Sequence, residues 1–76
     1  MFGNTIFENP QEHYVEYVLA EEQNLHVRIV VCEQNGHTML YRVEWPYGET
    51  THHSAHVQLS DAINLFSARI AERTHP

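Results

Sequence analysis

Three of the seven histidines lie together in the stretch THHSAH, residues 51–56. Imidazole nitrogens bind zinc, so this cluster raises the question of a metal site. The surrounding sequence alternates and predicts a strand, in which His52 and His56 would lie roughly 13 Å apart at about 3.3 Å per residue. Zinc needs each nitrogen about 2 Å from one ion, and only a helical turn would bring His52, His53 and His56 that close together. We therefore expect surface histidines and no metal site.

The single cysteine, Cys32, is the other reactive side chain. It cannot form an internal disulfide, and its position within an expected strand predicts a reduced thiol. The sequence contains no glycine-rich phosphate loop, nucleophile elbow or H-E-x-x-H motif. A chain of 76 residues also leaves little volume for a pocket around an activated thiolate. We expect no enzyme activity, no catalytic residues and no cofactor.

The charge of the chain restricts its partners. Ten acidic residues accompany four arginines and no lysine, which gives a net charge of −6. Binding a nucleic-acid backbone needs a cluster of positive groups, so direct nucleic-acid binding is excluded. A negative field favours a basic partner at low salt, and the partner that we expect is a larger protein, with a basic nucleic-acid-binding protein as one candidate.

Length and composition predict one small globular domain, residues 1–76. With 42% hydrophobic and 18% charged residues the chain is globular, and it contains no apolar run near the roughly 18 residues of a membrane span. Its start, MFGNTIFENP, lacks the basic end and the long apolar segment of a secretory signal. We expect a soluble, cytoplasmic protein that does not bind membranes.

Three stretches have the composition or alternation of strands, HYVEYVLA, LHVRIVVCE and HTMLYRVEW. A three-residue loop at 34–36, with Gly36 left-handed, would keep the apolar residues of the last two stretches on one face. The predicted pairs are Val31 with Met39, Ile29 with Tyr41, Val27 with Val43 and Leu25 with Trp45. In the first hairpin, a loop at 21–23 would pair Tyr17 with Val27. The result is an antiparallel meander with one apolar face.

A helix over SDAINLFSARIAER, residues 60–73, is expected to cover that apolar face. Ser60 would be its N-cap, and apolar residues recur at helical spacing. This apolar stripe consists of Leu59, Ala62, Ile63, Phe66 and Ile70. The predicted fold class is therefore α+β, an antiparallel β-meander of three to four strands with one C-terminal amphipathic helix packed on one face.

The opposite face of the sheet is the predicted partner site. In the expected register Tyr14, Val30 and Leu40 lie side by side and exposed, with Cys32 and Thr38 adjoining. A charged row lies next to this apolar centre, and His26 faces Glu44. An apolar centre with a charged rim is typical of a protein interface. The candidate partner-binding residues are Tyr14, Glu16, Val18, Arg28, Val30, Leu40 and Arg42. The alternative is that the N-terminal segment MFGNTIF folds over this face.

A short acidic chain with the meander YVEYVLAEEQNLHVRIVVCEQNGHTMLYRVEW and the final helix SDAINLFSARIAERTHP resembles the small phage-encoded anti-CRISPR proteins as a class. The resemblance lies in architecture and charge, and it covers most of the chain. It implies a non-enzymatic inhibitor that binds a CRISPR effector or nuclease subunit. The candidate residues above come from the analysis of the faces, and none is carried over from that class.

These observations predict a non-catalytic protein-binding module, a phage-type inhibitor of a bacterial protein, with the anti-CRISPR class as the specific candidate. Two alternatives remain open. One is a homodimeric accessory or regulatory protein that associates through the same apolar face. The other is a histidine-dependent metal-binding protein or small enzyme.

Overall fold

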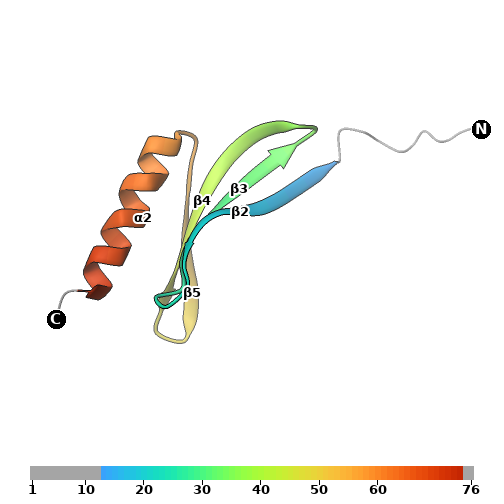
Figure 1. The fold of residues 1–76 in the computed structure, drawn as a ribbon. Coiled ribbons are helices and arrows are strands. Elements are labelled where there is room, and N and C mark those ends of the chain that lie inside the picture. Colours follow the sequence, from blue (N-terminus) through green and yellow to red (C-terminus); the bar gives the residue numbers. More distant parts are fainter. Residues whose placement is uncertain (1–12, 75–76) are drawn as a thin grey trace, which may run out of the picture.

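The computed structural model describes residues 13–74, and the segment MFGNTIF lies outside them. Four antiparallel strands form one sheet in the order β2-β3-β4-β5, and a single helix follows them (Figure 1). The elements are β2 (Tyr14–Glu22), β3 (Val27–Gln34), β4 (His37–Tyr47), β5 (Thr50–His56) and α2 (Leu59–Thr74). The predicted α+β class, a meander with one C-terminal helix packed on it, is confirmed.

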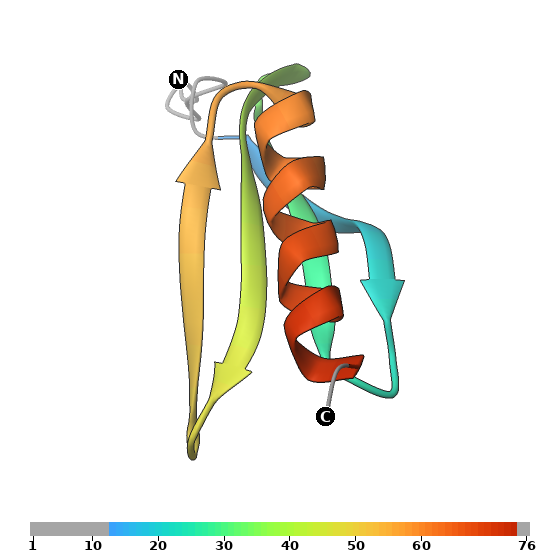
Figure 2. The ribbon, with the colours of Figure 1, turned by 90° about the vertical axis from the view of Figure 1, so that its left-hand side faces the viewer.

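Helix α2 packs on one face of the sheet, where it contacts β3, β4 and β5. Figure 2 shows it in front of β3, with β4 on one side and β2 on the other. The buried cluster between the sheet and α2 consists of Val27, Ile29, Val43, Trp45 and Ala62. Half-buried side chains around it include Phe66 and Ile70, as the helical spacing predicted.

The start of α2 differs from the expectation. The backbone amide of Ala62 donates to the carbonyl of Gln58, at 3.3 Å, so the first turn begins before Ser60, and Ser60 is not the N-cap. Leu59 and Ile63, predicted as part of the buried stripe, are exposed. Of the predicted apolar stripe, Ala62 is part of the core, and Phe66 and Ile70 pack against it.

Two arginines attach the C-terminal half of α2 to β4. The guanidinium of Arg69 lies over the Trp45 ring, 4.5 Å from its centroid, which is the geometry of a cation–π contact. Arg73 donates a hydrogen bond to the carbonyl of Pro46. Both contacts fix the position of the helix along the sheet.

The β3–β4 hairpin has a tighter turn than predicted. Asn35 and Gly36 both have positive φ, 55° and 82°, and Gln34 pairs directly with His37. These values fit a two-residue turn of the type that favours Asn-Gly, so the left-handed Gly36 is confirmed but the three-residue loop is wrong.

A bulge at Met39 then returns the apolar side chains of β3 and β4 to the same face of the sheet. Glu33 pairs with Thr38 but Cys32 pairs with Leu40, so β4 contains one extra residue there. Beyond it, Ile29 pairs with Val43 instead of Tyr41, two residues from the expected register. A shift by two leaves the same side chains on the same face, so the apolar face was predicted correctly despite the wrong partners.

The β2–β3 pair is also shifted from the prediction. Tyr17 pairs with Val31 rather than with Val27, because the connecting turn spans residues 23–26 and so lies later in the chain than the expected loop at 21–23. The Glu22 carboxylate stabilises this turn by accepting bonds from the amides of Asn24 and Leu25, at 2.8 and 3.3 Å. The register changes again between Val18 and Ala20, which leaves Leu19 in a bulge.

The histidine-rich stretch forms β5, as predicted. His52 lies opposite Trp45 and Ser54 opposite Val43, so these two side chains lie on the helix side of the sheet. His52 stacks on Tyr47 with 4.2 Å between ring centroids. The alternating residues His53 and Ala55 lie on the other side.

Candidate protein-binding surface

The sheet face opposite α2 is called the outer face below. Strand alternation and the observed register place on it Tyr14, Glu16 and Val18 of β2, Arg28, Val30 and Cys32 of β3, Leu40, Arg42 and Glu44 of β4, and His53 and Ala55 of β5. All seven sequence-predicted candidates therefore lie on one face. Thr38, expected beside them, lies on the helix side, because the bulge at Met39 reverses its direction.

A continuous network of charged side chains crosses the outer face. Arg42 binds both oxygens of Glu16, with Nη2–Oε1 at 2.7 Å and Nη1–Oε2 at 3.1 Å, and its Nε lies 2.7 Å from Glu44 Oε2. Arg28 Nε lies 2.6 Å from the other oxygen of Glu44. Tyr14 extends the network by donating its hydroxyl proton to Glu16 Oε2, at 2.7 Å.

Glu44 is the member of this network that sequence reasoning did not include in the site. It bridges Arg28 and Arg42 and so joins the two arginines into one unit. Its position two residues after Arg42 on β4 places both side chains on the same face, and this spacing was the available signal.

The expected exposed apolar centre is wrong. Val30 is only 3% exposed and Cys32 only 2%, and Leu40 is half-buried. The reason is the register, which places Arg42 opposite Val30 and extends its Nη1 to 3.7 Å from the Cys32 sulfur. Charged side chains therefore cover the middle of the face, and its large exposed apolar side chains, Tyr14 and Val18, lie on β2.

The network holds its carboxylates in the charged form. Hydrogen bonds from Arg42 first, and from Tyr14 second, lower the pKa of Glu16 from 4.5 to about 2. Burial alone would raise the pKa of Glu44, but the hydrogen bonds from Arg28 and Arg42 outweigh it and lower that pKa. Hydrogen bonds to Glu16 and Glu44 raise the pKa of Arg42 further above its ordinary value. At neutral pH the face presents fixed charges in fixed positions.

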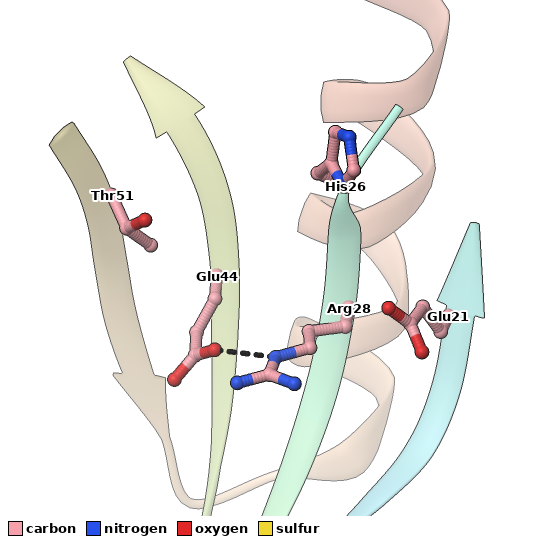
Figure 3. A pocket seen from close by; sticks show the side chains of 5 residues that line it. All are labelled: Glu21, His26, Arg28, Glu44 and Thr51. Carbon is pink, nitrogen blue, oxygen red and sulfur yellow. Dashed lines mark hydrogen bonds and ion pairs between the residues drawn. The ribbon is translucent and has the colours of Figure 1, made fainter. Parts of the chain in front are cut away.

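An open depression of about 410 Å³ lies at one end of the network (Figure 3). Its lining is polar, and Figure 3 shows Arg28 bonded to Glu44 across it. The lining residues are Glu21, His26, Arg28, Glu44 and Thr51. His26 was expected to face Glu44, but Arg28 is the residue opposite it. Such a lining suits a polar or charged side chain of a protein partner better than an apolar ligand.

The histidines of β5 are divided between the two faces of the sheet. His52 and His56 lie on the helix side, where His56 Nε2 is 2.9 Å from the Ser54 hydroxyl, and His53 lies on the outer face. Within residues 13–74, no group of three or more His, Cys, Asp or Glu side chains is placed to hold a metal ion.

Comparisons with known proteins add no relative. No family model matches the chain, and no curated protein or solved structure matches it either. Among residues 13–74, no helix has the length and apolar character to cross a membrane.

Proposed function

We propose that this chain is a non-catalytic protein-binding module that docks on a larger protein through its outer face. The observation that supports this most is the pre-formed network of Arg28, Arg42, Glu16 and Glu44 on a sheet face that α2 does not cover. Side chains already held in one geometry lose little conformational freedom when a partner binds, which favours recognition by a rigid surface.

The charge distribution supports a basic partner. All four arginines form ion pairs with glutamates of the same chain. Within residues 13–74, five acidic residues form no ion pair with an arginine: Glu21, Glu22, Glu33, Glu49 and Asp61. One of them, Glu21, lies opposite Arg28 at the edge of the outer face and lines its depression. A basic, nucleic-acid-binding protein complements this surface, whereas a nucleic acid would be repelled.

The specific form of the proposal is a phage-type cytoplasmic inhibitor of a bacterial protein, with the anti-CRISPR class as the candidate. A small acidic domain with a rigid polar face fits an inhibitor that occupies the basic surface of an effector. The test is a plaque assay, in which expression of the chain should restore plating of a phage that a host CRISPR system targets. Unchanged plating across a panel of CRISPR types would remove this class and leave the general binding role to be judged by the next experiment.

A matched pair of alanine substitutions tests the docking face. Ala55 lies on the outer face beside Arg42, and Ala68 lies on the exposed side of α2, and both are exposed. Ala55→Lys should abolish capture of partner proteins from a bacterial lysate, since it adds a long cationic side chain at the docking surface. Ala68→Lys makes the same charge change elsewhere and should capture the same proteins as the unaltered chain. Equal capture by both variants, with unchanged melting temperatures, would rule out the outer face.

A further inference from the structure

Strand β2 is an edge of the sheet, and its apolar side chains are exposed on both faces. Within residues 13–74 it pairs only with β3. Residues 14–19 contain five apolar side chains, interrupted only by Glu16, and these are between 38% and 53% exposed. They are Tyr14, Val15, Tyr17, Val18 and Leu19. The opposite edge, β5, has the polar sequence TTHHSAH, so the two edges differ in kind. A long apolar edge is the form of strand that pairs with another chain.

The free edge of β2 has its backbone groups in a regular order. The amide of Asn35 donates to the carbonyl of His13, at 2.9 Å, so His13 directs its backbone groups toward β3. Backbone direction alternates along a strand, so Val15 and Tyr17 also bond to β3. Tyr14, Glu16 and Val18 therefore direct their amides and carbonyls away from the sheet, where another strand can bind them.

The sequence of this edge is self-complementary. When a second β2 lies antiparallel with Glu16 on the two-fold axis, Tyr14 lies opposite Val18 of the other copy, and Val15 lies opposite Tyr17. The outward backbone groups of Tyr14, Glu16 and Val18 then meet as hydrogen-bonded pairs. Aromatic and β-branched residues opposite one another are favourable cross-strand pairs. We infer that β2 binds β2 of a second copy of this chain, which joins two sheets into one of eight strands.

The one charge at the centre of this interface is already compensated. Like charges directly opposite destabilise a strand pair, and this register brings two Glu16 side chains together. Each Glu16, however, accepts two hydrogen bonds from Arg42 of its own chain on the outer face. Each copy thus brings a neutral ion pair to the axis, which removes most of the repulsion.

The exposed area is sufficient for a reversible dimer. An aromatic side chain presents about 150–250 Å². Complete burial of these five half-exposed side chains in both copies would remove on the order of 1,000 Å² from solvent, which is the lower limit for a specific interface. The dimer should consequently form and dissociate within the accessible concentration range.

Light scattering over a range of concentrations tests the inference. The mass should rise from 8.9 kDa toward twice that value between micromolar and near-millimolar concentration. Val18→Pro removes an outward amide of β2 and leaves the bonds to β3 intact, so it should hold the mass at that of the monomer. Val18→Thr keeps the amide and the β-branched shape and should still dimerise. A constant mass of 8.9 kDa for the unaltered chain would overturn the inference, and so would a dimer that survives Val18→Pro.

A disulfide test reports the register and does not depend on the folding of the proline variant. Val15 and Tyr17 lie opposite each other across the proposed axis, at the short spacing of a non-hydrogen-bonded pair, which suits a disulfide. An equimolar mixture of Val15→Cys and Tyr17→Cys proteins should give a cross-linked dimer on mild oxidation, and neither protein alone should do so. Cys32 is buried on the other face and stays out of reach. Absence of the mixed cross-link would overturn the proposed pairing.

Discussion

Arg42 is the residue on which the outer face depends. Its guanidinium binds Glu16 on β2 and Glu44 on its own strand, and it lies over the sulfur of Cys32 on β3. One side chain thus joins three strands and covers the apolar groups beneath it. Arginine suits this role because its planar fork donates several hydrogen bonds at once, which a lysine ammonium group does in a less fixed geometry.

Acid should weaken the fold through Glu16. The pKa of Glu16 is about 2 in the folded chain and 4.5 ordinarily, so between these values the unfolded chain binds a proton that the folded chain does not. Stability from this group is therefore present above about pH 4.5 and is lost as the pH falls toward 2. Urea unfolding should be measured from neutral pH down to about pH 2. The Glu16→Gln variant should be less stable than the unaltered chain at neutral pH, and this difference in the free energy of unfolding should disappear near pH 2.

An exposed carboxylate in the β4–β5 turn provides the control for that measurement. Glu49→Gln changes the same chemical group at a site remote from Arg42, so its stability should follow that of the unaltered chain at every pH. A difference between Glu16→Gln and the unaltered chain that stays constant from neutral to acid pH would show that the Glu16 charge does not contribute.

For individual side chains, the sequence predicted which of them share a face but not which of them are covered. Alternation placed Val30 and Arg42 together on the outer face, and the structure confirms that placement. Burial of Val30 follows from the direct pairing with Arg42, whose long side chain extends over its neighbours. Strand periodicity has no information on which partner lies opposite, so the exposed apolar centre was predicted wrongly.

Among the strands, two bulges account for much of the difference between the predicted and the observed pairing. The extra residues are Leu19 in β2 and Met39 in β4. Each lies in a stretch with regular alternation or strand-forming composition. Neither stretch contains a glycine or proline that would indicate a bulge. With regular alternation, a two-residue Asn-Gly turn would mix the two faces of the β3–β4 pair. The extra residue Met39 shifts the pairing by one and keeps the apolar side chains on one face. The strands and helix were therefore predictable, whereas the register depended on irregularities that have no strong local signal.

The helix should be sensitive to volume at its closest approach to the sheet. Ala62 is fully buried within the core cluster, so α2 lies close to the strands at that point. Ala62→Leu adds a branched side chain there and should destabilise the fold by about 1–3 kcal/mol through overpacking.

Ala68→Leu, on the exposed side of α2, is the matched variant for the Ala62 experiment. The same substitution at a solvent-exposed site should change the free energy of unfolding by less than about 0.5 kcal/mol. Denaturant unfolding measures both variants. Equal effects at the two positions would mean that α2 does not pack on the sheet through Ala62.

In the whole molecule, the outer face and the β2 edge would bind different partners. The outer face supplies fixed charges to a larger partner, and the β2 edge supplies an apolar strand to a second copy. Dimerisation through β2 would place two outer faces on the same side of one continuous sheet. A partner with two equivalent sites would then bind both with higher avidity than it binds either one alone.

Removal of metal ions should leave the fold unchanged. The histidines of β5 point to opposite faces of the sheet, so ion binding is not expected to supply folding free energy. The melting temperature of the purified chain should be the same with and without a chelator. A clear decrease with chelator, together with stoichiometric zinc in the untreated protein, would instead favour a metal-binding role for the histidines.

The burial of Cys32 makes the motion of the sheet measurable. Its sulfur lies beneath Arg42 and beside the β2–β3 pair, at 2% exposure, and it is the one cysteine in the sequence. A thiol-specific reagent can reach it only when the strands around it separate, so the labelling rate of the native protein reports how often that local opening occurs. If a second copy or a partner holds β2 in place, the labelling rate should fall in proportion to the fraction of chain bound.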